Sequence, residues 1–269
     1  MANPRLIRTE AIVLRQRPIG DANKVCVLLS PTRGRIEAVA KGVRKTTSRL
    51  AGHVAPLSRG MFAIAPTRSL DIITQAQTLD AWPSLHDQIE RLTEAVAIAE
   101  LIERTAQPEH SADALYALLR GTLDELTSTA APRSVRWWFS LRFLDEQGYR
   151  PELDECVRCR SQLGPDDNGF AANDGGVVCP ACHRAGTGTR LSSPVFRLLR
   201  YMRRSSCEAT AQVRVDAEAS AELERHLRLL IEQALDGQLR SRGFAEAMAR
   251  AELVGRSAVK REESDRAPV

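Results

Sequence analysis

Four cysteines are the residues of this chain whose type and spacing most directly imply chemistry. Cys156 and Cys159 form one C-x₂-C pair, Cys179 and Cys182 form a second, and 19 residues separate the two pairs. This spacing is typical of zinc sites, because two residues between paired cysteines let both thiolates reach one tetrahedral ion at about 2.3 Å. Four thiolates close the coordination shell and leave no position for a reactive water. We therefore expect one structural zinc ion (Zn2+) per chain.

Other interpretations of the cysteines stay open on spacing alone. Four reduced thiols in a glycine-rich loop, a redox pair and an iron–sulfur cluster are the alternatives, although the two matched pairs favour zinc. His183 is a weaker candidate ligand, since it adjoins Cys182 and the two cannot easily share one tetrahedron. Cys26 and Cys207 stand alone, so six cysteines this unevenly placed do not form a disulfide scaffold.

The positive charge of the chain is concentrated near its N-terminus. The net charge is +4, but residues 1–70 hold 13 Lys or Arg against three acidic residues, and the remainder is therefore −6. No acidic residue lies between Ala38 and Leu70. A solubilising loop usually mixes charges of both signs, so this segment favours a polyanion such as nucleic acid. Phe62 is the only aromatic residue among the first 80, which predicts backbone contacts with little sequence preference.

Two kinds of element must position these groups, and the first kind is β-strands. The predicted strands, rich in β-branched residues or alternating with period two, cover residues 10–16, 23–29, 35–41, 61–65 and 70–78. Turn formers such as Gly20 and Gly34 separate them. Five short strands in about 80 residues predict a small closed barrel.

Helical spacing of apolar residues begins after Trp82-Pro83. We expect a helix of about 20 residues capped by Ser84, and a second helix capped by Ser111. Further helices are predicted from Pro132 to Gly148, from Ser193-Pro194, after Asp216 until Gly237, and over Phe244 to Leu253. Residues 255–269 carry too little apolar surface to pack and are expected to be disordered.

The composition also excludes some classes of protein. No stretch approaches the roughly 20 uninterrupted apolar residues of a membrane span, and the arginine-containing start lacks the apolar run of a signal peptide. We therefore expect a cytoplasmic protein without a membrane partner.

Several short motifs, in their order and spacing, resemble the RecO recombination-mediator family. They are the strand pair over 10–29, Ala40-Lys41-Gly42-Val43-Arg44-Lys45, Ser48-Arg49-Leu50-Ala51-Gly52, Gly148-Tyr149-Arg150-Pro151-Glu152-Leu153 before the first cysteine pair, and Leu239-Arg240-Ser241-Arg242. The resemblance covers the chain from about Arg8 to Leu253. It implies an α+β multidomain protein, with a five-stranded OB-fold barrel at 1–80 and an all-helical domain at 81–254. A zinc ribbon with four cysteine ligands, at 151–190, interrupts the helical domain, and the tail covers 255–269.

The resemblance also implies a function in DNA repair and recombination. Members bind single- and double-stranded DNA, anneal complementary strands, and with RecR help load RecA on DNA coated by single-strand-binding protein (SSB). Carried over residue by residue, the implied DNA-binding positions are Lys24, Arg35, Lys41, Arg44, Lys45 and Arg49.

Two other functions compete with this interpretation. An enzyme acting on nucleic acid could also combine an OB-fold, a zinc module and helices, but the chain has no Lys-x-Asp-Gly motif, no Walker phosphate loop and no His-Glu-x-x-His. We therefore expect no enzymatic activity. An RNA-binding OB-fold protein is the second rival, because backbone contacts to RNA and DNA look alike in a sequence.

Overall fold

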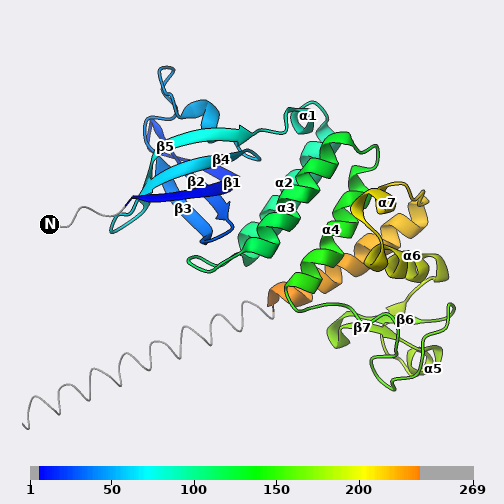
Figure 1. Cartoon of the computed structure of the whole chain (residues 1–269). Helices are drawn as coiled ribbons and strands as arrows, with labels where there is room; N and C mark the ends of the chain where they lie inside the picture. Colours follow the sequence, from blue (N-terminus) through cyan, green and yellow to red (C-terminus); the bar gives the residue numbers. More distant parts are fainter. Residues whose placement is uncertain (1–5, 237–269) are drawn as a thin grey trace, which may run out of the picture.

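The computed structural model describes residues 6–236, and its first part is a closed five-stranded barrel (Figure 1). Its strands are β1 (Ile7–Ile19), β2 (Asn23–Ser30), β3 (Gly34–Ala40), β4 (Arg59–Ala65) and β5 (Asp71–Asp80). Around the barrel they follow the order β1-β2-β3-β5-β4, with β4 pairing back to β1 and with β3 and β5 parallel. The one-turn helix η1 (Ala51–His53) lies between β3 and β4. This arrangement is an OB-fold, as predicted.

The two faces of β1 and β2 are both buried, for different reasons. Val13 and Leu28 point into the barrel, where they pack with Phe62. Their neighbours Ile12 and Leu29 alternate to the outer face and belong to the core of the helical part. Because successive side chains of a strand point to opposite faces, the continuous apolar sequences of β1 and β2 contribute both to the core inside the barrel and to the core of the helical part.

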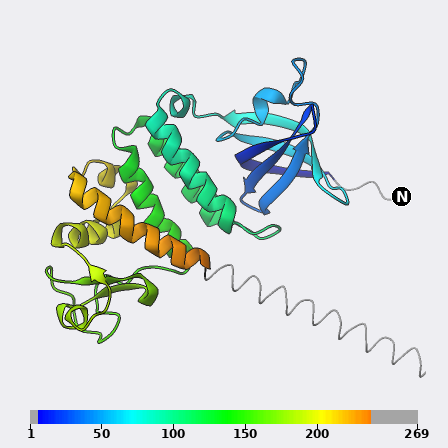
Figure 2. The ribbon, with the colours of Figure 1, turned by 180° about the vertical axis from the view of Figure 1, so that it is seen from behind.

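Helices fill the middle of the molecule, between the barrel at one end and a small sheet at the other (Figures 1 and 2). They are α1 (Pro83–His86), α2 (Ile89–Thr105), α3 (Asp113–Ser128), α4 (Pro132–Glu146), α6 (Ser193–Arg204) and α7 (Cys207–Ala211). A further helix runs over residues 217–236, up to the end of the described part, and is called the 217–236 helix below. No helix among residues 6–236 combines the length and hydropathy needed to cross a membrane.

The small sheet belongs to a module inserted between α4 and α6. It comprises β6 (Gly169–Ala171), β7 (Gly176–Val178) and β8 (Thr189–Arg190) in the order β7-β6-β8, with η2 (Ala172–Asp174) and α5 (Pro180–Arg184) beside them. Phe170 of β6 is buried, and its ring centroid lies 4.4 Å from that of His226 on the 217–236 helix. The module is therefore packed onto the helices.

The predicted caps of the first two helices are wrong. The expected 20-residue helix is two helices: α1 ends at His86, the backbone of Gln88 is extended (φ −131°, ψ 117°), and α2 begins only at Ile89. The N-cap of α1 is Trp82, in a left-handed conformation (φ 42°). Ser84 lies inside α1, so it caps nothing. Before α3 the N-cap is Ala112, and the Ser111 hydroxyl donates instead to Asp113 and to the Pro31 carbonyl. At Ser111 a tertiary contact with Pro31 takes the place of the capping hydrogen bond, and local sequence does not encode that contact.

Other predicted helix starts are confirmed. Pro132 occupies the first turn of α4, and α6 begins at Ser193 with Ser192 as its N-cap. Asp216 accepts a hydrogen bond from the backbone N–H of Ala219 at the start of the next helix. The predicted end at Gly237, the helix over 244–253, the Leu239–Arg242 motif and the 255–269 tail lie outside the described residues.

Gly34 joins the barrel to the helices. It has φ +61°, and a Cβ there would lie 2.1 Å from the Gln107 carbonyl oxygen and 2.6 Å from that of His110. The missing side chain lets the loop before α3 approach closely, and the Arg35 N–H then donates to the Gln107 carbonyl at 3.1 Å.

Candidate metal centre and nucleic-acid interface

The four paired cysteines meet at one point of the inserted module. Their Sγ atoms all lie within 4.8 Å of one another, and the Sγ atoms of Cys159 and Cys179 are 3.6 Å apart. A tetrahedral ion with bonds of about 2.3 Å places its sulfur ligands about 3.8 Å apart, so this cluster has the dimensions of such a site. None of the four is in a disulfide. The set can therefore hold one metal ion with a closed shell of thiolates.

Local structure brings each pair into position. After Cys156 the chain turns tightly, and the Arg160 N–H donates to the Cys156 carbonyl at 2.9 Å. The second pair begins where β7 ends, with Cys179 as the N-cap of α5 and Cys182 inside that helix. Each C-x₂-C therefore lies in a sharp turn, as the spacing predicts.

The surroundings of the cluster shift the pKa values of two of its thiols in opposite directions. The Cys182 backbone N–H and the Ser161 hydroxyl lower the pKa of the Cys179 thiol to about 6. Burial and the neighbouring thiols of Cys159, Cys179 and Cys156 raise the pKa of Cys182 to about 12. Adjacent thiolates repel one another, and a bound cation removes this repulsion.

His183 lies outside the cysteine cluster. Its Nδ1 lies 3.1 Å from the Thr187 carbonyl oxygen, and its ring lies so close to Gly169 that a Cβ there would be 2.5 Å from Nδ1. The histidine therefore packs the loop after α5.

The residues that hold this module on the helices were not predicted from the sequence. Asp154, two residues before Cys156, receives ion pairs from three arginines of α6: Arg203 at 2.5 Å, Arg200 at 3.2 Å and Arg204 at 3.3 Å. The arginine spacing on an amphipathic helix was visible, but their partner lies about 50 residues away in the sequence. Only the fold brings the two together.

The second candidate site is the loop over residues 41–50, which follows β3. Lys41, Arg44, Lys45 and Arg49 are exposed on it. Gly42 has φ +66°, and its N–H donates to the Asn23 side chain at 2.8 Å. The base of the loop is therefore held to the β1–β2 hairpin, and its cationic side chains extend into solvent.

The structure divides the cations of the barrel into neutralised and unpaired groups. Arg15 pairs with Glu103 at 2.6 Å, Arg17 with Glu37 at 3.8 Å, and Arg59 with Glu10 at 3.0 Å. In the described part of the chain, the following form no ion pair: Arg8, Lys24, Arg33, Lys41, Arg44, Lys45, Arg49 and Arg68. Formal charge counted along the sequence overstates the free charge, because half-buried carboxylates neutralise part of it.

Two of the six predicted DNA-binding residues lie on strands rather than on the 41–50 loop itself. The Arg35 guanidinium faces Glu37 at 3.7 Å and the Glu103 backbone carbonyl of α2 at 3.4 Å. Lys24 donates to the Gln16 side-chain oxygen at 2.8 Å. The structure thus brings together Lys41, Arg44, Lys45 and Arg49. Lys24 lies beside the turn of the β1–β2 hairpin and pairs with Ala40, directly before the loop, whereas Arg35 is turned toward the helices.

Both parts of the chain match known proteins. The family models described as "Recombination protein O N terminal" and "Recombination protein O C terminal" match residues 1–82 and 86–243. A DNA repair protein RecO of Dehalococcoides mccartyi is 30% identical over 253 residues, covering 94% of this chain and 100% of the relative. Proteins of the same name from Roseiflexus sp. (36% over 244 residues, covering 89% and 85%) and Heliobacterium modesticaldum (33% over 258 residues, covering 94% and 92%) are also similar. The chain therefore belongs to the RecO family of DNA repair proteins.

Proposed function

We propose that this protein is a recombination mediator that binds single- and double-stranded DNA through the 41–50 loop of its OB-fold and anneals complementary strands. The observation that carries this proposal is the set of four exposed cations on that loop, Lys41, Arg44, Lys45 and Arg49, none of which has an acidic partner in residues 6–236. Lys24 would extend this surface along the β1–β2 hairpin. Arg35 contributes less, because its guanidinium already faces Glu37 and α2.

Annealing requires charge rather than a catalytic side chain. Two DNA strands repel each other through their phosphates, and a protein that neutralises phosphates on both strands raises their rate of encounter. We therefore propose that the protein acts without turning over nucleotide or DNA. In the same proposal it works in the cytoplasm, acts on DNA coated by SSB, and helps RecR load RecA.

A strand-annealing assay tests this function. Purified protein should accelerate pairing of two complementary oligonucleotides without ATP, at low salt, and lose most of this effect at high salt. Product that forms only with ATP, or nuclease cleavage, would instead show an enzyme. A competition experiment with RNA of the same length is the second arm, and a strong preference for RNA would favour the RNA-binding alternative.

We also propose a division of labour along the chain. Residues 1–80 form the DNA-binding domain, residues 81–254 form the helical domain, and the module at 151–190 holds one structural zinc ion at Cys156, Cys159, Cys179 and Cys182. The closed thiolate set would hold zinc as a cross-link of the module, so metal binding and local folding should be coupled.

Elemental analysis of purified protein decides the identity of the metal. One zinc per chain is expected, and iron with visible absorbance would point to an iron–sulfur cluster. Cys156→Ser should lower the metal content and the yield of folded protein, while DNA affinity per folded molecule stays unchanged. A parallel loss of affinity would contradict a purely structural role.

A further inference from the structure

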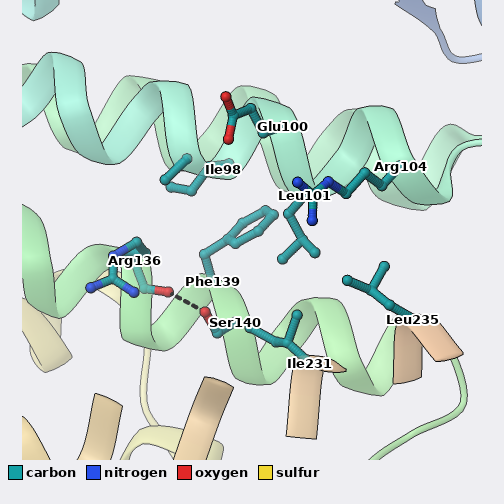
Figure 3. A pocket seen from close by; sticks show the side chains of 10 residues that line it. Ile98, Glu100, Leu101, Arg104, Arg136, Phe139, Ser140, Ile231 and Leu235 are labelled. Atoms are coloured by element: carbon teal, nitrogen blue, oxygen red, sulfur yellow. Dashed lines mark hydrogen bonds between the residues drawn. The ribbon is translucent and has the colours of Figure 1, made fainter. Parts of the chain in front are cut away.

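A small apolar pocket lies between α2, α4 and the 217–236 helix (Figure 3). Ile98 and Leu101 line it from α2, Phe139 from α4, and Ile231 and Leu235 from the 217–236 helix. Its volume is about 200 Å³, below the roughly 300 Å³ at which small-molecule sites begin. The pocket is therefore suited to one or two apolar side chains of a polypeptide.

Charges of both signs surround the pocket. Glu100 lies at its edge (Figure 3), and Arg136 at the opposite edge is already bound by Glu94 and by Glu224, the latter at 3.0 Å. Arg104 is the one other charged residue of the lining. On the 217–236 helix, the exposed Glu232 and Asp236 each directly follow a lining residue. The side of the pocket formed by the 217–236 helix is therefore acidic, and a positively charged segment that continues from this helix fits that side.

The chain itself supplies such a segment next to the pocket. Leu235 lines the pocket and the described part ends one residue later, so the 33 residues from 237 to 269 continue from the pocket's own rim. Residues 237–243 contain Arg240 and Arg242, no acidic residue, and a glycine at each end. These glycines allow the chain to reverse direction.

The next residues carry apolar side chains at the spacing of one helical face. Phe244, Ala247, Met248 and Ala251 stand at positions i, i+3, i+4 and i+7. Eight residues separate Leu235 from Phe244, and an extended chain of that length spans up to about 28 Å. The segment can therefore reach back over the pocket.

We propose that residues 244–251 dock on this pocket of their own chain, with Phe244 and Met248 filling it and with Arg240 and Arg242 facing Glu232 and Asp236. Because a tethered segment has a high effective concentration, a modest affinity is enough to keep the pocket covered. The docked segment would bridge α2 and the 217–236 helix. Any protein that uses this apolar surface would first have to displace it.

Hydrogen–deuterium exchange on the full-length protein tests the contact. The double variant Phe244→Asp/Met248→Asp should speed exchange in peptides covering 97–104 and 227–235 by about tenfold, as expected if the contact is formed about 90% of the time. The matched control is Ala245→Asp/Ala249→Asp, which adds the same charge about 100° around a helix from Phe244 and Met248 and should leave both peptides unchanged. Equal exchange in wild type and both variants would overturn the proposal.

A second measurement separates this contact from other occupants. A synthetic peptide of residues 239–254, added to the Phe244→Asp/Met248→Asp variant, should restore protection of 97–104, and a peptide carrying both substitutions should not. If the protection in the wild type instead grows with protein concentration, a second copy covers the pocket and the intramolecular proposal is wrong. If the peptide has no effect at millimolar concentration, the pocket does not bind this segment.

Discussion

Replacing Lys41, Arg44 and Lys45 by glutamate should remove most of the DNA affinity and reduce its dependence on salt. These three side chains are exposed on the 41–50 loop, and none has an ion pair in the described part of the chain. The one side-chain hydrogen bond that reversal removes there is that of Arg44 to the Gly20 carbonyl at 3.4 Å. The loop is anchored by backbone bonds, including that from the Arg44 N–H to Ala22 at 3.0 Å. These remain in the variant, and the barrel should fold normally.

The magnitude follows from counterion release. Each phosphate contact on single-stranded DNA contributes about 0.7 to the slope of log affinity against log salt, so losing three contacts lowers the slope by about two units. At 0.1 M salt the same three contacts are worth roughly a hundredfold in affinity. Reversal to glutamate adds repulsion, so a hundredfold is a lower bound for the variant.

Fluorescence anisotropy with a labelled single strand, titrated at several salt concentrations, measures both quantities. The control reverses Arg197, Arg214 and Arg228, which are exposed in the helical part without an ion pair in residues 6–236. Arg200 and Arg203 are unsuitable, because they bind Asp154 and their reversal would loosen the module. If the control variant lost its binding while the loop variant kept the full salt slope, the DNA site would lie on the helices and the reasoning would be refuted.

Three further predictions test how the parts are held together. Gly34→Ala should lower the free energy of unfolding by more than about 2 kcal/mol, because a Cβ at this position has no room beside two carbonyl oxygens. Gly121→Ala is the control: this glycine lies inside α3 with open space around it, so alanine should raise the free energy of unfolding by up to about 1 kcal/mol. Urea unfolding measures both changes. Tyr116→Phe removes the 2.6 Å hydrogen bond from the Tyr116 hydroxyl to the Glu10 carboxylate, and this bond is the main cause of the lowered pKa of Glu10. The variant should lose about 1–2 kcal/mol of unfolding free energy in the same assay. An unchanged midpoint would contradict a role of this bond in joining the barrel to the helices. Burial lowers the pKa of His226 below the value of about 6.5 that a histidine has in the unfolded chain. As pH falls, this histidine is therefore protonated in the unfolded chain before it is protonated in the folded protein, and the free energy of unfolding should decline below about pH 6.5. His226→Leu should flatten this decline, and an equal slope in both proteins would assign it to other groups.

The sequence by itself determined the elements whose signal is local. Period-two alternation over 35–41 and the turn at Gly34 predicted β3, and Pro132 predicted the start of α4, because these patterns act within a few residues. The two C-x₂-C pairs predicted a four-cysteine cluster for the same reason, since each pair is a single turn. The order of motifs was enough to identify the RecO family, which the comparisons confirm.

Tertiary structure decided what depends on residues far apart in the chain. The predicted long helix is interrupted at Gln88, whose backbone is extended (φ −131°, ψ 117°). Ahead of α1, Trp82 takes a left-handed conformation and its buried indole donates to Asp124 of α3 at 2.6 Å, a partner that only the fold supplies. Arg35 was grouped with the loop cations by its charge, but β3 turns its guanidinium toward α2. Charge and propensity are properties of single residues, whereas pairing and burial depend on the partner that the fold supplies. For that reason the sequence located the basic segment, and only the structure distinguished its unpaired cations from those already neutralised.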